Sequence, residues 1–336
     1  MKPFAAYSRR YERKRRLISA GLRARDLKRD SYRADAIQTG DILLFATLRN
    51  EGPRLPYFLD YYRSRGVNHF LIVDNGSDDE GPALLRAAND VSLWTTNASY
   101  RRANFGVHWM NDLMRRFAPG HWCLVVDPDE FLVYPHCDSR DIRMLTEHLD
   151  GGGRVSMGTI LLDLYGEGPV SETTCAVGED PVAAAPYFDP ANYFIRRNDR
   201  YRNLWIQGGP RLRAFFHDRP MHAPALNKIP LVKWRAGAVF VSSTHAILPR
   251  RYNVTYDDEG GETLTGALLH TKFLSTLGQK VEEELTRGEH FAGGREYRAY
   301  SDQIDAGLTL WNDHSAKYED WRQLVALGLM SRGGWL

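Results

Sequence analysis

Three acidic residues follow an apolar run near the middle of the chain. Residues 123–126 are apolar or β-branched, Asp127, Asp129 and Glu130 come next around a proline, and a second apolar run covers 131–134. We expect both apolar runs to be short adjoining strands, with the acidic residues at the C-terminal tip of the first. Two carboxylates two residues apart, held by a proline of fixed φ, can bind one hard divalent cation. The pattern thus predicts a cation site, and a solvated Asp-Pro turn is the alternative.

Two further polar clusters lie upstream, each directly after an apolar run. Residues 41–48 are followed by the polar loop 49–51, and residues 69–73 are followed by the polar run 74–79. In open α/β sheets, ligands bind outside the carboxyl ends of the strands. If these strands are parallel, the polar tips meet at one edge of the sheet, which favours a ligand site over a solvated turn.

The segments between the tips alternate between helical and strand patterns. We expect helices over residues 55–66, 81–89 and 107–117, a strand over 91–95 and an irregular loop over 97–105. After residue 151 the pattern is weaker, and we expect strands over 154–164, 229–234, 239–243 and 268–273, a helix from 277, and loops over 166–200 that cover a cleft. Strand and helix in alternation with short loops are typical of a mainly parallel, three-layer α/β sheet flanked by helices.

Residues 41–135 resemble the family 2-type glycosyltransferases of the GT-A fold. The resemblance rests on Arg-Asn-Glu at 49–51, Val-Asp-Asn-Gly-Ser at 73–77 and Asp-x-Asp-Glu-Phe at 127–131. Beyond them it rests on LLHTKF at 268–273 and on Gly-Gly-Pro-Arg at 208–211. It implies a GT-A (Rossmann-like) sheet with a mixed acceptor-side half. The chain would then divide into a basic arm (1–38), a nucleotide-sugar-binding half (39–150) and an acceptor-side half with C-terminal helices (151–336).

The resemblance implies a metal-dependent enzyme that moves a sugar from a nucleotide sugar, UDP- or GDP-linked, to a hydroxyl of a glycan or lipid-linked acceptor. Mn²⁺ or Mg²⁺ would bridge the donor diphosphate and stabilise its growing charge. Asp127 and Asp129 would be the carboxylate pair, with Asp129 the direct ligand, and His270 would complete the metal shell. His245 is the rival histidine, and a core histidine on a strand is the alternative for His270. An imidazole ligand tilts the choice toward Mn²⁺.

Other site residues are also implied by the resemblance. A carboxylate can accept from a base N–H or a ribose hydroxyl, and two arginines can clamp a diphosphate, unless they lie on a solvated loop. The expected nucleotide-sugar ligands are Asn50, Glu51, Asp74, Arg101, Arg102, Asn104 and Asp127. Arg211 and Arg213 would face the donor or an anionic acceptor.

An inverting transfer, which we expect, needs a carboxylate that takes the proton of the acceptor hydroxyl. Asp163, Asp218 and Glu289 are the three possibilities in the acceptor-side half. A retaining enzyme would need no such base.

The composition is that of a soluble globular protein of 336 residues, with 43% hydrophobic and 26% charged residues. It contains no run of eighteen apolar residues and no apolar leader, and its three cysteines lack the spacing of a zinc site or a disulfide framework. We therefore expect a cytoplasmic protein.

The positive charge is concentrated at the N-terminus. Residues 1–33 hold twelve Lys and Arg against three acidic residues, a local charge of +9, whereas the whole chain carries +2. Such an arm predicts contact with an anionic membrane surface, which would place the protein peripherally at the inner face of a membrane. Sparse aromatic residues argue against nucleic acid. A helical extension that packs on the acidic body is the alternative.

Two other function classes fit parts of the pattern. A sugar-nucleotide nucleotidyltransferase also uses an α/β sheet with metal-binding acids, but it needs a glycine-rich loop with a basic residue after the first strand, and residues 48–54 match that poorly. A non-catalytic protein could bind polyanions or membranes through the arm. The intact pair of Asp127 and Asp129 argues against a degenerate core.

Overall fold

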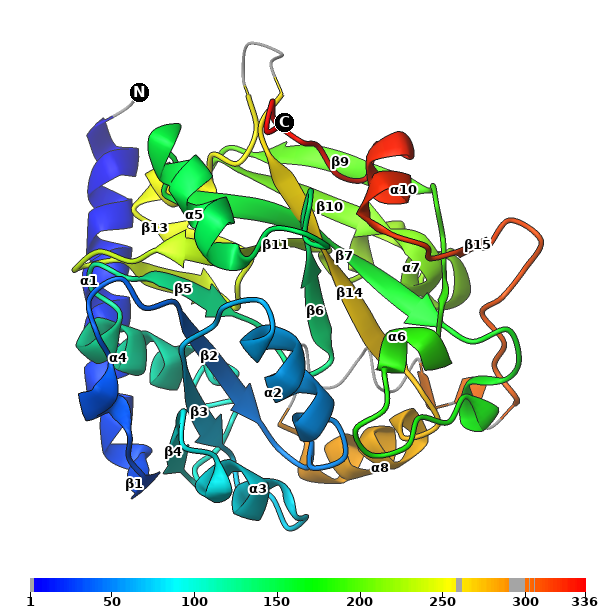
Figure 1. The fold of residues 1–336 in the computed structure, drawn as a ribbon, viewed down its shortest axis with the longest axis horizontal. Coiled ribbons are helices and arrows are strands. Elements are labelled where there is room, and N and C mark those ends of the chain that lie inside the picture. The colour runs from blue at the N-terminus through cyan, green and yellow to red at the C-terminus, as the bar shows by residue number, and fades with distance from the viewer. Residues whose placement is uncertain (1–2, 258–261, 290–299, 302, 305) are drawn as a thin grey trace.

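One large mixed sheet runs through the molecule in the computed structural model, which describes residues 3–257, 262–289, 300–301, 303–304 and 306–336 (Figure 1). Eleven of the described strands form it, in the order β1-β4-β3-β2-β5-β11-β7-β14-β6, with β8 on β7 and β15 on β8. Their bounds are β1 Lys28–Ser31, β2 Leu43–Leu48, β3 His69–Asp74, β4 Val91–Thr95, β5 Trp122–Val125, β6 Glu130–Val133, β7 Ser156–Tyr165, β8 Tyr187–Phe188, β11 Asn227–Lys233, β14 Thr265–Phe273 and β15 Ala316–Lys317.

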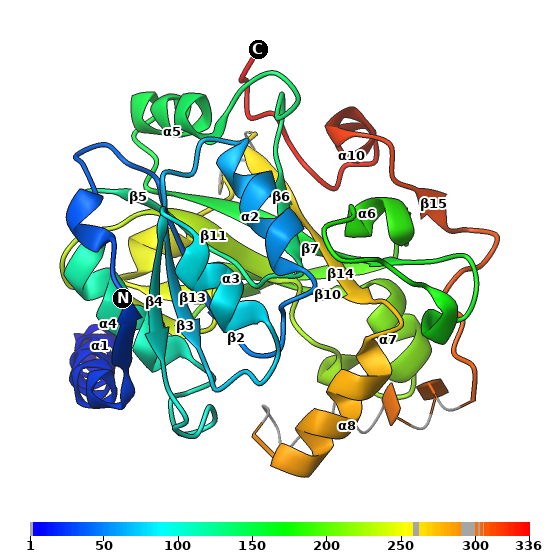
Figure 2. The same ribbon diagram turned by 60° about the horizontal axis from the view of Figure 1, so that its bottom comes forward.

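Helices cover both faces of this sheet (Figures 1 and 2). They are α1 Pro3–Arg23, α2 Leu55–Arg63, α3 Gly81–Ala87, α4 Val107–Phe117, α5 Ile142–Gly151, α6 Pro181–Ala184, α7 Gly209–Phe215, α8 Leu277–Arg287 and α10 Trp321–Ala326. Alternate residues of a strand point to opposite faces. In β2, Leu44 and Ala46 accordingly join a core with residues of α2, α3 and α5, whereas Leu43 and Phe45 join a second core with residues of α4. The predicted fold class, an α/β sheet flanked by helices, is confirmed.

The parallel half of the sheet carries the three predicted tips. Strands β4, β3, β2 and β5 pair in parallel, with Leu48 opposite Asp74 and Phe45 opposite Val125. Every residue of β3 is buried, as expected for a central parallel strand. Strands β2, β3 and β5, which end at Leu48, Asp74 and Val125, therefore end at one edge of the sheet.

The other half is mixed, and one predicted neighbour relation is wrong. β11 lies antiparallel between β5 and β7, and β14 is parallel to β7. β6 does not adjoin β5, since it pairs with β14, where Val133 lies opposite Ala267. Residues 127–130 form a turn in which the Glu130 N–H donates to the Asp127 carbonyl. Pairing with β14 supplies the ladder bonds that β6 needs. Strands from before and after the predicted boundary at residue 150 belong to the same sheet.

The basic arm is ordered against the body. α1 packs on α4 and on β12 (Val239–Ser242), and the Arg16 guanidinium donates to the Val241 carbonyl over 2.6 Å. Glu12 on the same helix is buried and accepts from Arg200 and Tyr201. Residues 28–31 of the predicted arm are a sheet strand, because β1 pairs antiparallel with β4. Within the described part of the chain, no helix has the length and apolar character needed to span a bilayer.

A β-hairpin interrupts the region predicted as loops at 166–200. β9 (Tyr193–Asn198) pairs antiparallel with β10 (Asn203–Gly208). The interior residues of β9 are mostly exposed on both faces, so the strand shows no alternation that the sequence could reveal. A separate small sheet joins β12 to β13 (Ala246–Leu248).

The hairpin ends at Gly208, whose backbone conformation a residue with a side chain could adopt only with strain. Its φ is +148°, and a Cβ there would lie 2.1 Å from the carbonyl oxygen of Asn192. We expect Gly208→Ala to lower the free energy of unfolding by about 3 kcal/mol or more. The matched control is Gly21→Ala in α1, where a Cβ meets no atom within 4 Å. That change should raise stability by about 0.5–1 kcal/mol because alanine favours helix. Urea unfolding of both variants checks the pair, and equal stabilities would contradict the packing described.

Candidate functional site

The acidic tip after β5 is held by a buried lysine of β11. Lys228 Nζ lies 2.7 Å from Glu130 Oε1 and 3.6 Å from Asp127 Oδ2, and the Asp127 N–H is capped by Glu130. Burial disfavours the charge of Lys228, but these carboxylates outweigh it and raise its pKa. Sequence analysis missed Lys228. Lys228 follows Asn227 at the start of β11, whose sequence is NKIPLVK, so its position resembles a polar strand end and does not indicate a buried charge.

Asp127 and Asp129 differ in charge state although they are two residues apart. Desolvation and then the Glu130 carboxylate raise the pKa of Asp127 to about 7. Its side chain is 55% exposed on the outer side, so solvent screens part of this effect. Desolvation also opposes ionisation of Asp129, but His270, Arg54 and Lys280 outweigh it and hold the pKa well below its usual range. Asp129 is therefore the permanent anion of the pair.

A buried series of charged side chains leads away from Asp129. His270 Nε2 lies 3.4 Å from Asp129 Oδ2, and His270 Nδ1 lies 2.6 Å from Asp163 Oδ1. The other Asp163 oxygen accepts from Arg211 Nε over 2.7 Å. Strand register places these groups, because His270 of β14 lies directly opposite Asp163 of β7 and Glu130 of β6. Asp129, His270, Asp163 and Arg211 form what we call the buried charge series.

The two carboxylates fix the protonation of His270. Burial disfavours the imidazolium, but Asp129 and Asp163 outweigh it and raise the pKa of His270 to about 9. Desolvation raises the pKa of Asp163, but Arg211 and His270 overcome it and lower the value. Asp163 is thus ionised and paired on both oxygens, which leaves it no proton-accepting role toward an acceptor hydroxyl.

Asp129 and His270 have the spacing of two ligands to one metal ion. Two ligand atoms about 2.1 Å from a common ion lie about 3–3.5 Å apart, and Oδ2 and Nε2 are 3.4 Å apart. Asp163 then accepts from the second ring nitrogen, as carboxylates commonly do behind metal-binding histidines. No group of three or more His, Cys, Asp or Glu side chains that could hold a metal occurs in the part of the chain that is described. A metal ion bound by Asp129 and His270 would replace the proton between their side chains and would take its other ligands from a bound molecule.

The rival histidine, His245, lies apart from these carboxylates. Its Nδ1 lies 2.6 Å from the backbone oxygen of Asn227. Desolvation, with Lys228 nearby, lowers the pKa of His245 from 6.5 to about 3.

A folded-state pKa below the unfolded value makes His245 an acid-sensitive position. The unfolded chain takes up a proton near pH 6.5 while the native imidazole stays neutral, so native stability is lost as pH falls. We expect unfolding free energy to drop by about 2 kcal/mol between pH 7 and pH 5 from this residue. His245→Gln should flatten that slope in urea unfolding at the two pH values, and an unchanged slope would contradict the neutral buried state.

Helix α8 covers the loop that contains Asn50 and Glu51. The Arg49 and Asn50 side chains both donate to the Glu283 carboxylate, and Lys280 forms an ion pair with Glu51. Glu51 also pairs with Arg54 over 2.9 Å. The loop and the helix enclose a cleft of about 380 Å³. Its lining includes Asn50, Arg54, Tyr57, Asp78, Lys280 and Glu283.

Asp74 shapes the second tip. It is buried and accepts from the Ser77 N–H and hydroxyl, which folds the polar loop back over the strand end. The next residue, Asn75, bonds to the Thr96 and Ala98 carbonyls and accepts from Arg287 of α8. The first two predicted tips therefore both contact α8.

Glu289 fastens the loop at 97–105. Its carboxylate accepts from the Ser99 hydroxyl over 2.6 Å and from the Arg101 N–H over 2.7 Å. Arg101 and Arg102 are exposed on this loop. Asn104 has a positive φ of 53°, and its side-chain amide donates to the Val241 carbonyl. Glu289 is thus engaged in holding this loop.

Two other predicted residues lie farther along the acceptor-side half. Asp218 follows α7 in a loop, its side chain is 86% exposed, and it pairs with His217 over 3.2 Å. Arg213 pairs with Asp189. Both arginines of α7 therefore contact carboxylates of the protein: Arg211 binds Asp163 and Arg213 binds Asp189.

A second, smaller cavity of about 110 Å³ adjoins Asp127. It is lined by Lys228 and by the hydroxyls of Thr47 and Thr244, which are buried and have no hydrogen-bond partner among the described residues. Buried hydroxyls normally find partners, so this cavity offers polar groups to a ligand at the acidic tip. Sequence analysis had no signal for either threonine, since strand threonines are common.

Comparison with known proteins gives only weak structural likenesses. No family model matches the chain, and no curated protein matches it by sequence. Among solved structures, a mannosyltransferase from Pyrobaculum calidifontis in complex with GDP-Man and Mn²⁺ is 15% identical with a TM-score of 0.29, over 46% of this chain and 45% of that one. A 4-diphosphocytidyl-2C-methyl-D-erythritol synthase is 16% identical with a TM-score of 0.26, over 42% and 66%. The inositol-1-phosphate CTP transferase from T. maritima is 10% identical with a TM-score of 0.27, over 88% and 97%.

The chain spans less than half the length of the mannosyltransferase that it matches. At these identities and TM-scores the likenesses assign no activity. The functional assignment therefore rests on the side chains of the site.

Proposed function

We propose that the chain is a metal-dependent glycosyltransferase, which moves a sugar from a UDP- or GDP-linked donor to a hydroxyl of a glycan or lipid-linked acceptor. The observation that carries this proposal is the buried charge series that ends at Asp129, beside the edge where the parallel strands end. Four charged groups in one buried row are costly to fold and are typical of functional sites.

Each member of the series has a role in the proposal. Asp129 and His270 would hold Mn²⁺ or Mg²⁺, and the bound ion would supply positive charge against a diphosphate leaving group. Asp163 accepts the His270 Nδ1–H and thereby aims Nε2 at Asp129. Arg211 holds Asp163 ionised and in place. Asp127, with its raised pKa, lies at the outer side of the metal pair and contacts the donor.

The donor nucleotide belongs, in this proposal, to the region between the Arg49–Glu51 loop and α8. Asn50, Glu51 and Asp74 supply polar groups at the strand ends, and Arg54 and Lys280 supply positive charge at the 380 Å³ cleft. Arg101 and Arg102 are exposed on the adjacent loop and are available to a diphosphate. Residues 39–150 thus supply most of the donor site, Lys280 of α8 adds to it, and the remainder of residues 151–336 binds the acceptor.

Among the three carboxylates predicted as base, Asp218 best suits an inverting reaction. Asp163 is paired on both oxygens and Glu289 holds the loop of Arg101. Asp218 is exposed, and within the described residues its ion pair is with its neighbour His217. A base must be open to the acceptor hydroxyl. Asp163 is better described as a positioning residue.

Product analysis tests the proposal against the nearest alternative. The protein is incubated with Mn²⁺, UDP- and GDP-sugars and a mixture of glycan and lipid-linked acceptors, and separately with nucleoside triphosphates and sugar 1-phosphates. We expect nucleoside diphosphate release in the first incubation. Pyrophosphate release in the second would identify a nucleotidyltransferase instead, and release in neither would contradict both enzymatic assignments.

A further inference from the structure

The small cavity beside Asp127 is lined by two buried threonine hydroxyls. Thr47 comes from the end of β2, and Thr244 comes from the turn between β12 and β13. Each Oγ1 atom is buried and has no hydrogen-bond partner among the described residues. A buried hydroxyl costs free energy unless it forms a hydrogen bond. The two threonines therefore indicate that a bound group supplies the missing partners.

The turn that carries Thr244 is fixed in place by the adjacent strand. The Ile229 N–H of β11 donates to the Thr244 carbonyl over 2.8 Å. His245 Nδ1 lies 2.6 Å from the Asn227 carbonyl oxygen of the same strand. Ser243 has a φ of +42°, a left-handed conformation that costs free energy for a residue other than glycine. The Thr244 hydroxyl is thus held in a position that local backbone preferences do not favour.

The segment before α4 lines another part of the cavity, and its backbone is also strained. Asn104, Phe105 and Gly106 have successive φ values of +53°, +57° and +74°. Phe105 and Gly106 line the cavity. A Cβ at Gly106 would lie 3.1 Å from Thr47 Cγ2, so the glycine lets the chain approach this threonine closely. Strained residues in two separate segments around one cavity are typical of a ligand site.

The size of the cavity limits what can enter it. Its volume is about 110 Å³. That is the volume of about four water molecules, at about 30 Å³ each in the liquid. A complete sugar ring is too large for this space, whereas a single substituent of a sugar fits it.

The lining favours a neutral group that has both polar and apolar atoms. Met110 and Phe240 add apolar surface to the two hydroxyls. Lys228 also lines the cavity, but its Nζ already forms ion pairs with Glu130 and Asp127. An anionic group would meet these two carboxylates, and a cationic group would meet the ammonium. An acetamido group fits, because its N–H and carbonyl can bond to hydroxyls while its methyl group contacts apolar side chains.

We propose that this cavity receives the acetamido group of a 2-acetamido-2-deoxy sugar, so that the donor is a nucleotide-linked N-acetylhexosamine. The inference rests on the proposed function, since it requires a nucleotide sugar at Asp127. Asp127 and Glu130 line the cavity and belong to the same turn as Asp129. A group in the cavity therefore lies close to the diphosphate. The acetamido-bearing carbon is the neighbour of the carbon that carries the diphosphate, which places the two groups together.

Two pairs of ligands test the acetamido preference. Isothermal titration calorimetry with Mn²⁺ compares UDP-N-acetylglucosamine with UDP-glucose. Thermal unfolding with the methyl glycosides of the same two sugars repeats the comparison without a nucleotide. We expect the acetamido member to bind about tenfold more tightly or better, since two added hydrogen bonds contribute roughly this factor. A preference in either pair supports the inference, and its absence from both pairs would overturn it.

The variant Thr47→Val/Thr244→Val removes both hydroxyls and keeps the branched shape of the side chains. We expect the preference to disappear. The unfolding midpoint should be unchanged or higher, because no hydrogen bond within the described residues is lost. The matched control is Thr146→Val in α5, which removes a threonine hydroxyl that donates to the Arg143 carbonyl. It should keep the preference. An unchanged preference in the double variant would overturn the assignment to this cavity.

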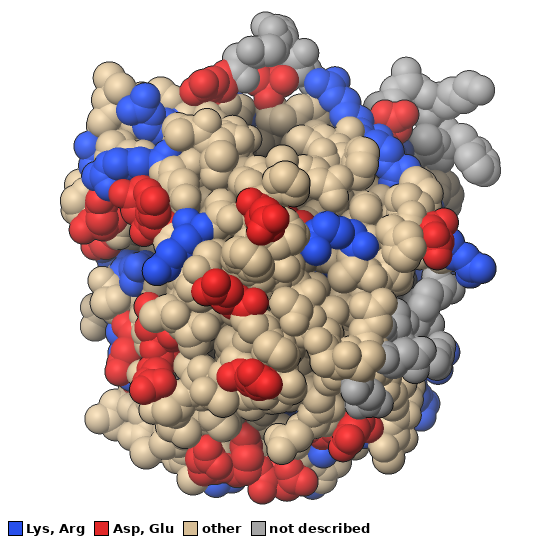
Figure 3. Space-filling model, turned by 90° about the vertical axis from the view of Figure 1, so that its right-hand side faces the viewer, with Lys and Arg blue, Asp and Glu red and all other residues tan. Residues whose placement is uncertain are grey.

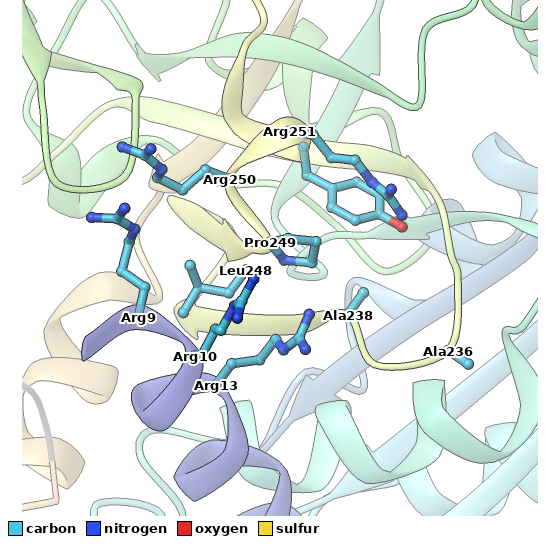
Figure 4. A pocket seen from close by; sticks show the side chains of 10 residues that line it. Arg9, Arg10, Arg13, Ala236, Ala238, Leu248, Pro249, Arg250 and Arg251 are labelled. Carbon is cyan, nitrogen blue, oxygen red and sulfur yellow. The ribbon is translucent and has the colours of Figure 1, made fainter. Parts of the chain in front are cut away.

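A second control concerns binding through the phosphates alone. A groove of about 710 Å³ lies between α1 and the turn after β13 and is lined by Arg9, Arg10, Arg13, Arg250 and Arg251 (Figure 4). The side of the molecule in Figure 3 instead carries acidic and basic side chains in mixed positions. A nucleotide sugar held at the groove by its diphosphate would show no acetamido preference. Arg10→Ala/Arg13→Ala should therefore leave the preference unchanged, and its loss in this variant would overturn the cavity assignment.

The failure of this inference is distinguishable from failure of the proposed function. Release of nucleoside diphosphate without an acetamido preference in either pair would leave the transferase proposal standing and overturn the cavity assignment. A methyl glycoside preference that is lost in Thr47→Val/Thr244→Val, with no reaction of any nucleotide sugar, would support the acetamido cavity and contradict the transferase proposal.

Discussion

Asp129→Asn is expected to lower the rate of sugar transfer by about 10³-fold or more while the fold is retained. The asparagine keeps the shape of the side chain but removes the negative charge, and removal of a charge that stabilises a transition state costs on this scale. Asp129 is the permanent anion at the end of the buried charge series, 3.4 Å from His270. Metal-dependent donor binding should be lost together with transfer.

The measurement is the initial rate of nucleoside diphosphate release, with circular dichroism and urea unfolding as controls of the fold. Asp138→Asn is the matched control, because Asp138 is a carboxylate whose partner is the exposed Arg322 at the surface. It should leave the rate unchanged. Full activity of Asp129→Asn would remove Asp129 from the site, and unfolding of that variant would show that its role is structural.

Asp163→Asn is expected to have the largest effect on stability. The change removes the charge between two buried cations, so Arg211 loses its pair with Asp163 and His270 keeps only its contact with Asp129. Breaking a buried charge pair from one side costs about 3–5 kcal/mol. We also expect metal affinity to fall about 10- to 100-fold, because the second ring nitrogen of His270 loses its acceptor.

Asp60→Asn provides the comparison at the surface. Asp60 pairs with Arg63, but its side chain is 76% exposed. The loss should be within about 1 kcal/mol, as is usual for exposed ion pairs. Urea unfolding measures both variants, and Mn²⁺ titration at a pH where both remain folded separates metal binding from stability. If Asp163→Asn were as stable as Asp60→Asn, the series would not be the paired, buried arrangement described.

The parallel half of the fold was predictable from the sequence for local reasons. β2, β3 and β4 are short apolar runs that end in polar loops, and α4 shows apolar residues at helical spacing. In these segments the pattern of apolar residues indicates directly which side chains are buried. The polar tips after β2, β3 and β5 follow from strand direction alone, since parallel strands end at a common edge.

Pairings between distant segments were not predictable in the same way. β6 pairs with β14, more than a hundred residues away, and no local pattern distinguishes that partner from β5. The same holds for two contacts in the site, that of Asp163 with Arg211 and that of Glu283 in α8 with Asn50. In each case the sequence does not indicate the partner, because the packing of distant segments determines it.

Thermal unfolding against a panel of nucleotides and nucleotide sugars, with and without Mn²⁺, tests the central claim most directly. Selective binding to the native state raises the unfolding midpoint by mass action. We predict a rise for one nucleoside diphosphate and its sugar conjugate that requires Mn²⁺ and is absent in Asp129→Asn. No rise with any nucleotide, or an equal rise in that variant, would contradict a metal-assisted nucleotide-sugar site at Asp129 and His270.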